Sequence, residues 1–187
     1  GLAFAMPFSL VYQMMSDRMK GLQKSEKVIK GLPFAAGFTA GTAVSIAGNM
    51  HYVIYAQIIP LIEKLTGKEV SSYWFPDATR YIGYNPYREE DRTIHEFPCY
   101  SFVLGDLHAH VVNIMFVLLV IALLYVWLRG VRKKTVPVET SMKDGKFWKE
   151  QLLMPHLLVI SVLLGMFQWT NFWDFVIYYV VTLGTVL

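Results

Sequence analysis

Residues 111–128 read VVNIMFVLLVIALLYVWL, a run without a charged residue in which Asn113 is the one strongly polar residue. A helix needs about 20 mainly apolar residues to cross the hydrocarbon core of a bilayer. A core helix of a soluble protein rarely stays uncharged over such a length. This stretch therefore predicts a membrane-spanning helix, and a large soluble α-helical core is the alternative.

Further apolar stretches extend the same prediction along the chain. Residues 33–48, PFAAGFTAGTAVSIAG, are rich in the small residues Gly, Ala, Ser and Thr, which allow neighbouring membrane helices to approach closely. The others are residues 152–169 and two shortened stretches at the ends, 2–15 and 175–187. Together they predict an all-α fold, a polytopic transmembrane helical bundle with about five spans or part-spans and one long outer loop.

Composition narrows the class of protein further. Of the 187 residues, 55% are hydrophobic and 17% are charged, against about a quarter charged in an average soluble domain. This balance excludes a disordered chain, and the lone Cys99 excludes a disulfide framework. A net charge of +3 is too small to indicate nucleic acid binding. Because the chain starts at Gly1 and ends within an apolar run, we expect residues 1–187 to be a single transmembrane domain fragment of a larger multi-spanning chain surrounded by membrane lipids.

Basic residues indicate how the chain lies across the membrane. Of the 17 Lys and Arg residues, five fall in the segment 16–30 and seven in the segment 129–150. Short loops rich in Lys and Arg face the cytoplasm, so both segments are predicted to be cytoplasmic. If residues 33–48 and 111–128 each cross once, residues 49–110 form an extracytoplasmic loop region and residues 170–174 share its side. The sequence thus predicts a protein integral to the cell membrane.

The outer segment opens with an apolar stretch and continues as an aromatic loop. Residues 52–65, YVIYAQIIPLIEKL, show helical spacing of apolar positions and predict a helix that lies in the membrane interface or extends the preceding span. Residues 66–100 are loop-like and unusually aromatic. Their rings predict either an aromatic belt at the membrane interface or a platform on which a sugar or lipid headgroup stacks.

Ionisable residues concentrate in the same segment. Asp77 and Arg80 lie in FPDATR, and the mixed charge run 88–92 predicts a solvated loop. The motif TIHEFPCYSFVLGDLHAH, residues 93–110, runs directly into the apolar span and adds His95, Glu96, Asp106, His108 and His110. Ionisable side chains near the hydrocarbon are costly unless they have a partner or a wet cavity, so these residues are candidates for function.

Asp106, His108 and His110 form the densest polar group. In an extended segment alternate side chains share one face, and a carboxylate with two imidazoles suits a divalent metal ion, whether Mg²⁺, Mn²⁺ or Zn²⁺. In a helix, Asp106 and His110 share a face and His108 points away. Alternatively, Asp106 caps the span that follows, and both histidines lie in the headgroup layer.

A second polar cluster, WTNFWD at residues 169–174, is predicted on the same side of the membrane. In one interpretation Asp174 caps the last part-span. In the other, Asn171 and Asp174 complete a composite polar pocket with residues of the first cluster, namely Glu96, Asp106 and His110.

These two clusters resemble motifs of the YYY-type multi-spanning membrane protein family. The family pattern is close to T-I-N-E-F-P-F-F-S-F-L-x-x-D-L-H-x-H, followed later by N-T-W-D-F-P. The chain matches this pattern at Glu96, Phe97, Pro98, Ser101, Phe102, Asp106, Leu107, His108, His110, Asn171, Trp173, Asp174 and Phe175. It departs from the pattern at His95, Phe172 and Val176, where the family commonly has Asn, Thr and Pro. The resemblance covers residues 73–179.

That family is similar in architecture to GT-C glycosyltransferases, which are membrane enzymes that take sugars from polyprenyl-phosphate carriers at the outer face. The resemblance implies a GT-C-like transferase with a polyprenyl-phosphate sugar donor and with Asp106 or Glu96 as the catalytic carboxylate. It also implies that His108 and His110, with Asp106, bind a divalent metal ion or phosphate. The substrate-binding candidates are Asp77, Arg80, Asn171, Trp173 and Asp174, and Arg80 would neutralise phosphate charge.

Two other functions compete with this one. A membrane transporter or channel would need polar groups along a whole pathway, whereas the middles of the predicted spans are nearly uncharged. In a non-enzymatic membrane scaffold protein, Asp106 and Asp174 would be helix caps and nothing more.

Overall fold

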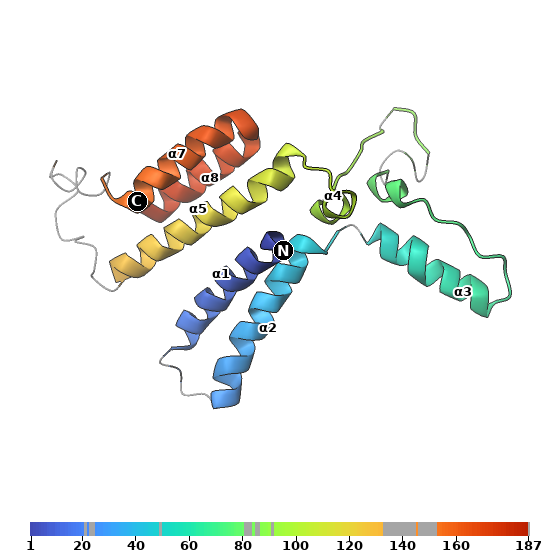
Figure 1. Ribbon diagram of the computed structural model, residues 1–187, viewed down its shortest axis with the longest axis horizontal. Coiled ribbons are helices and arrows are strands. Elements are labelled where there is room, and N and C mark those ends of the chain that lie inside the picture. The colour runs from blue at the N-terminus through green and yellow to red at the C-terminus, as the bar shows by residue number, and fades with distance from the viewer. Residues whose placement is uncertain are drawn as a thin grey trace. The chain divides into compact units, whose positions relative to one another are not determined.

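The computed structural model describes residues 1–20, 22, 25–48, 50–80, 84, 87–90, 92–132, 145 and 153–186. Within these ranges the chain is all-helical, as predicted, and forms no strand beyond an isolated bridge between Tyr84 and Tyr87. The chain divides into two compact units, Ala3–Leu107 and His108–Leu187, which are described in turn (Figure 1). The described residues leave out much of the predicted cytoplasmic loop 129–150. They also leave out residue 152, the first of one predicted span, and residue 187, the last of another.

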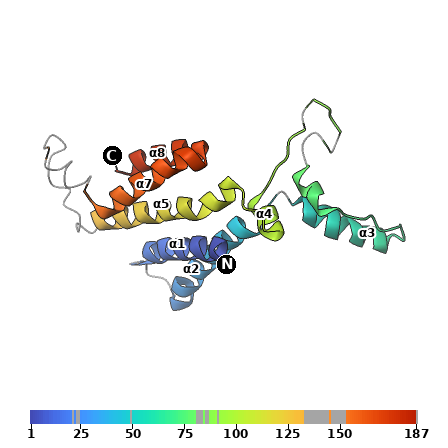
Figure 2. The same ribbon diagram turned by 45° about the horizontal axis from the view of Figure 1, so that its top comes forward.

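The first unit begins with a helical hairpin. Helices α1, Leu2–Met19, and α2, Glu26–Ser45, lie side by side (Figures 1 and 2). Gly37 and Gly41 lie on the buried face of α2. A Cβ atom at Gly37 would lie 2.8 Å from the carbonyl oxygen of Phe8 in α1, so the two backbones are almost in contact there. Small residues on α2 therefore allow the close helix approach that the sequence predicts.

Short helical segments make up the rest of the first unit. The π-helix η1, Val53–Ile58, runs directly into α3, Ile59–Leu65, so the predicted helix over residues 52–65 is confirmed. Pro60, in the first turn of α3, has no amide hydrogen to donate, and the wider π-turn lies immediately before it. A 3₁₀ helix, η2, covers Phe75–Thr79, and α4 covers Pro98–Leu104.

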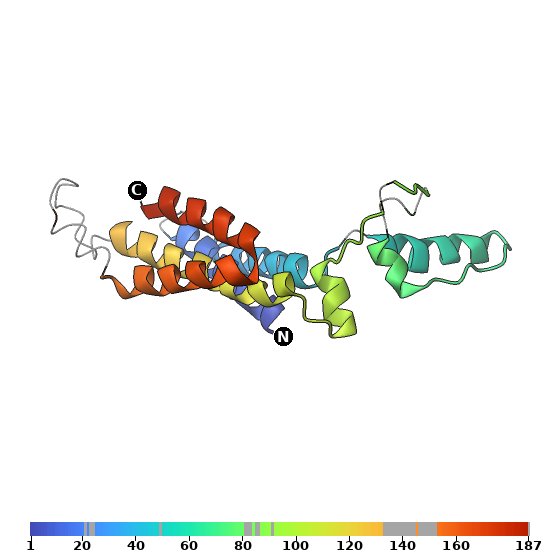
Figure 3. The same ribbon diagram turned by 90° about the horizontal axis from the view of Figure 1, so that it is seen from above.

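The second unit consists of three packed helices. They are α5, Ala109–Arg132, α7, Pro155–Thr170, and α8, Phe172–Val186 (Figure 3). Buried side chains recur every three or four residues on facing sides of α5 and α7. They are Val120, Leu124, Trp127, Leu157, Ile160, Leu163, Leu164 and Phe167. Helix α8 has no fully buried residue, and many of its apolar side chains face outward, which is typical of a helix that contacts lipid.

Membrane-spanning length is reached by one helix of the described part of the chain. Within α5, Ala109–Gly130 provides 22 residues with a mean hydropathy of 2.8. Helices α7 and α8 are apolar but have 16 and 15 residues, whereas a span needs about 20. Charged residues shorten the apolar parts of α1 and α2, namely Asp17, Arg18, Glu26, Lys27 and Lys30. Among the described residues, α5 is therefore the one helix that supports a membrane span, and the bundle of several spans stays a prediction.

Candidate functional site

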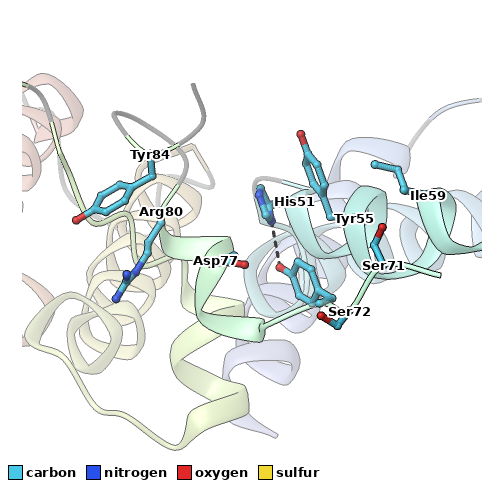
Figure 4. A pocket seen from close by; sticks show the side chains of 9 residues that line it. His51, Tyr55, Ile59, Ser71, Ser72, Asp77, Arg80 and Tyr84 are labelled. Carbon is cyan, nitrogen blue, oxygen red and sulfur yellow. Dashed lines mark hydrogen bonds between the residues drawn. The ribbon is translucent and has the colours of Figure 1, made fainter. Parts of the chain in front are cut away.

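A pocket of about 500 Å³ lies in the first unit (Figure 4). Its walls come from the helical stretch that begins at His51, from the loop that precedes η2, and from η2 with the residues after it. The lining residues are His51, Tyr55, Ile59, Ser71, Ser72, Tyr73, Asp77, Arg80 and Tyr84. A pocket of this volume is typical of small-molecule sites. It brings together two residues predicted to bind substrate, Asp77 and Arg80.

His51 and Tyr73 form a hydrogen-bonded pair in the wall of this pocket. His51 is 5% exposed, and its Nδ1 lies 3.1 Å from the hydroxyl oxygen of Tyr73. The imidazole also stacks on Tyr55, with ring centroids 4.4 Å apart. Burial, and secondly the negative charge of Asp77, raise the pKa of Tyr73 above its ordinary value of 10.0. The phenol therefore keeps its proton at neutral pH and presents a neutral hydroxyl group.

Asp77 and Arg80 are held by η2. The Arg80 amide donates a hydrogen bond of 3.0 Å to the Asp77 carbonyl oxygen and closes the turn between them. In Figure 4 the Asp77 side chain points toward the hydrogen-bonded His51, while Arg80 and Tyr84 lie on the other side of Asp77. Within the described residues Arg80 makes no ion pair with a carboxylate. Its positive charge is therefore not neutralised by an acidic side chain there.

Aromatic rings hold two arginine side chains near the rim of the pocket. The Arg80 Cζ atom lies 5.0 Å from the ring centroid of Trp74 and 5.4 Å from that of Tyr84. The Arg92 Cζ atom lies 5.4 Å from the same Tyr84 ring and 4.4 Å from that of Tyr87. Cation–π contacts orient a guanidinium without cancelling its charge. Two positive groups near Tyr84 can therefore bind an anion such as phosphate.

Glu96 and Asp106, the predicted catalytic carboxylates, belong to the first unit but do not line this pocket. Glu96 is half-buried ahead of α4, and Asp106 is exposed after it. Gly105 ends α4 in the left-handed conformation with φ +70°, and the Asp106 amide then donates to the Ser101 carbonyl oxygen at 3.0 Å. The carboxylate that the pocket contains is instead Asp77.

His108 and His110 lie at the start of the second unit. Their rings are nearly parallel, with centroids 5.9 Å apart and an interplanar angle of 13°. Helix α5 begins at Ala109, and the His108 carbonyl oxygen accepts hydrogen bonds from the amides of Val111 and Val112, each at 3.0 Å. His108 thus precedes the helix while His110 lies in its first turn. Neither the fully extended nor the fully helical form considered for this segment is observed.

Asn113 connects the three helices of the second unit. It is 1% exposed, and its Nδ2 atom donates to Asp174 Oδ2 at 3.0 Å and to Thr170 Oγ1 at 3.1 Å. Asp174 lies in the first turn of α8, and Thr170 ends α7. Of the other candidates here, Asn171 follows the last residue of α7 and Trp173 is exposed. Asp174 therefore has a buried amide as its partner, which is a structural role that its sequence position does not reveal.

The predicted composite pocket draws on both units. Glu96 and Asp106 belong to the first unit, and the second contains His110, Asn171 and Asp174. The same boundary separates Asp106 from the two histidines predicted to bind metal with it. In the part of the chain that the structure describes, no three His, Cys, Asp or Glu side chains form a group that could hold a metal ion. The composite pocket and its metal stay predictions, and no chemical step is assigned to a metal.

Three residues of these sites do not follow from the sequence patterns, namely His51, Tyr73 and Asn113. A signal for Asn113 exists, because a strongly polar residue within an apolar span usually has a partner. His51 and Tyr73 are 22 residues apart, and no local spacing predicts that they meet.

The described part of the chain is all-helical, and α5 has the length and apolarity of a membrane span. Together these features indicate the class of α-helical membrane proteins. The sequence model of a family described as "Uncharacterized membrane protein (DUF2298)" matches residues 1–187, and the chain belongs to this family. No curated protein and no solved structure matches the chain. The family supports a location in a membrane, whereas the YYY-type name, the likeness to GT-C glycosyltransferases and the sidedness of the loops stay predictions.

Proposed function

We propose that the chain is part of a GT-C-like membrane enzyme that transfers a sugar from a polyprenyl-phosphate donor to an acceptor hydroxyl at the extracytoplasmic face. The observation that carries this proposal is the pocket of about 500 Å³ that contains aromatic rings, one carboxylate and one guanidinium. Membrane localisation supports it, because a lipid-linked donor is confined to the bilayer. The basic segments 16–30 and 129–150 favour an extracytoplasmic pocket through the positive-inside rule.

Each part of the pocket has a chemical role in this proposal. Arg80 binds the donor phosphate, since its guanidinium has no carboxylate partner within the described residues. The rings of Tyr55 and Tyr73 provide flat surfaces for the apolar face of a sugar. Asp77, whose side chain points toward His51 in Figure 4, is the carboxylate nearest to the bound sugar in this arrangement.

The proposed reaction transfers the sugar from polyprenyl phosphate directly to the acceptor hydroxyl and needs no third reactant. The oxygen atom of the acceptor hydroxyl attacks the anomeric carbon of the sugar, and the bond between that carbon and the phosphate oxygen breaks. Polyprenyl phosphate leaves with the electron pair of that bond, and Arg80 stabilises its developing charge. Asp77 accepts the proton of the acceptor hydroxyl as general base. Glu96 and Asp106, which the family resemblance favours, are the competing candidates for this last role.

The test is a transfer assay on the full-length protein in proteoliposomes with a radiolabelled polyprenyl-phosphate sugar. Asp77→Asn should lower turnover by about 10²–10⁴-fold, the usual contribution of a general base, with an unchanged circular dichroism spectrum. Arg80→Gln should raise the KM for the donor. Arg88→Gln is the matched control, since Arg88 is exposed and lies outside the pocket. Turnover at the wild-type level in both pocket variants would refute the role of the pocket.

The rival carboxylates are separated in the same assay. Asp106→Asn and Glu96→Gln should leave turnover within a few-fold of the wild type if Asp77 is the base. Loss of turnover in Asp106→Asn alone would transfer the catalytic role to Asp106 and support the composite pocket. A protein that consumes no lipid-linked sugar in any form would refute the enzymatic proposal.

A non-enzymatic scaffold is the second candidate, and one observation favours it. The carboxylate of Asp174 accepts a hydrogen bond of 3.0 Å from the buried amide of Asn113, as expected of a helix-joining contact. If the protein is a scaffold, Asp174→Asn should lower its thermal stability, and neither the wild type nor the variant should transfer a sugar. If Asp174 binds the substrate of an enzyme, Asp174→Asn should also change the KM.

A further inference from the structure

His51 is a buried titratable residue that the proposed sugar transfer does not use. The residue is 5% exposed and lies in the wall of the pocket. Burying a polar ring is costly unless it makes hydrogen bonds, whereas an aliphatic side chain would fill the same space without that cost. The contacts of the imidazole therefore indicate what it contributes to the pocket.

The backbone just before His51 fixes where the imidazole enters the pocket wall. Met50 has a φ of 61°, in the left-handed region that residues other than glycine rarely adopt. The Met50 side chain is 54% exposed, so its own packing does not explain this conformation. Strained backbone of this kind persists where the surrounding structure holds it in place. Here it turns the chain directly into the helical stretch that begins at His51.

Two contacts join His51 to aromatic rings from different parts of the chain. Its Nδ1 atom lies 3.1 Å from the hydroxyl oxygen of Tyr73, a contact drawn as the dashed line in Figure 4, and Tyr73 belongs to the loop before η2. The imidazole stacks on Tyr55, about one helical turn later, with ring centroids 4.4 Å apart and an interplanar angle of 24°. Both tyrosines line the pocket. His51 thus sets the position of one ring relative to the other.

We infer that His51 is a positioning residue that holds the rings of Tyr55 and Tyr73 in the arrangement that binds the sugar of the donor. The inference rests on the proposed function, which assigns sugar binding to these two rings. A side chain that is free to rotate loses conformational entropy when a ligand fixes it, and a ring that is fixed beforehand avoids that loss. His51 therefore acts on the affinity of the pocket for the sugar.

The backbone that carries the groups assigned to the bond-breaking step is held independently of His51. The Asp77 amide donates to the Trp74 carbonyl oxygen at 2.9 Å, and the Arg80 amide donates to the Asp77 carbonyl oxygen at 3.0 Å. These hydrogen bonds lie within η2 and its flanking residues. Loss of the His51 side chain should therefore raise the KM for the donor and leave kcat within about twofold of the wild type.

Two substitutions separate the contacts of His51 in the transfer assay on the full-length protein. His51→Asn keeps a polar atom near the position of Nδ1 for Tyr73 but removes the stacking on Tyr55, and His51→Phe does the reverse. Each contact contributes about two- to tenfold to binding, so each variant should raise the KM by about that factor, and His51→Ala by more than either. Lys64→Asn, at an exposed position of α3 outside the pocket lining, is the matched control and should keep the wild-type KM.

A double-mutant comparison tests whether His51 acts through the tyrosine rings, and it holds even if the larger phenylalanine disturbs folding. In a Tyr55→Leu background the stacking is already lost, so His51→Asn should cause no further rise in the KM. A full additional rise would overturn the inference. A fall in kcat as large as that of Asp77→Asn, with an unchanged KM, would assign His51 to the chemical step and would also overturn it.

Sugar binding is measured separately from transfer by saturation-transfer NMR with the methyl glycosides of glucose, galactose, mannose and N-acetylglucosamine. Binding that is lost in His51→Ala, in a protein that transfers no sugar, would leave the inference standing while the proposed function falls. Transfer with a wild-type KM in His51→Ala would overturn the inference alone. Equal glycoside binding by the wild type and His51→Ala would refute the inference, as would the absence of both binding and transfer.

Discussion

Replacing Gly37 by Ala should weaken the α1–α2 hairpin, because the added methyl group has no room. The new Cβ atom would lie 2.8 Å from the Phe8 carbonyl oxygen and 3.2 Å from Tyr12 Cβ. Carbon–oxygen contacts across helices normally lie at about 3.3–3.6 Å. The nearest atom belongs to the backbone, which a change of rotamer cannot move, so the helices must separate by several tenths of an ångström.

The magnitude follows from two opposing effects. Forcing a methyl group into a packed interface costs about 1–3 kcal/mol. Alanine is favoured over glycine within a helix by about 1 kcal/mol. Gly31 isolates the second effect, since it lies in the same helix and a Cβ atom there has nothing within 4 Å. The free energy of unfolding of Gly31→Ala should therefore exceed that of Gly37→Ala by about 1–3 kcal/mol.

The assay is unfolding of the full-length protein in mixed micelles by titration with sodium dodecyl sulfate, followed by fluorescence transfer between labels on the two helices. Gly41→Ala provides an intermediate case. The two atoms nearest to its Cβ, at 2.8 Å and 2.9 Å, belong to the Phe4 ring, which can turn, and the nearest backbone atom, the Phe4 carbonyl oxygen, lies at 3.0 Å rather than 2.8 Å. Equal changes in Gly31→Ala and Gly37→Ala would refute the close backbone approach.

Three further outcomes are expected. Asn113→Ala should lower the free energy of unfolding by about 1–3 kcal/mol because it leaves the Asp174 carboxylate without its amide donor; an unchanged value in the same titration would contradict that hydrogen bond. Tyr73 has a raised pKa, so the unfolded chain loses its phenol proton first and stability should fall as the pH rises above about 10. Tyr73→Phe should show a smaller fall in the free energy of unfolding between about pH 9 and about pH 11 than the wild type, and an undiminished fall would exclude Tyr73 as a source of it. Glu63 accepts hydrogen bonds from the Ser71 hydroxyl at 2.6 Å and, secondly, from the Ser71 amide at 2.9 Å, and these lower the pKa of Glu63 below 4.5. The contact should persist above pH 4.5 and be lost as the pH falls, so the Ser71 amide chemical shift should titrate in the wild type and stay flat in Glu63→Gln.

The sequence alone determined the helical class of the protein and the position of its clearest span. Residues 111–128 contain no charge, and a backbone in hydrocarbon must satisfy its own hydrogen bonds, so helix α5 follows from composition. The small residues of 33–48 likewise predicted a close helix contact, which Gly37 and Gly41 make. These properties are local, because each depends on residues within a few turns of one another.

Tertiary structure alone decided which polar groups meet. His51 reaches Tyr73 across 22 residues, and Asn113 reaches Asp174 across 61, so neither contact has a signature in local spacing. Asp77 is the carboxylate of the pocket lined by His51 and Arg80 because η2 turns its side chain toward His51. Asp106 follows α4 and does not line this pocket. Such pairings depend on how separate helices pack, and packing is set by the shapes of side chains distant in sequence.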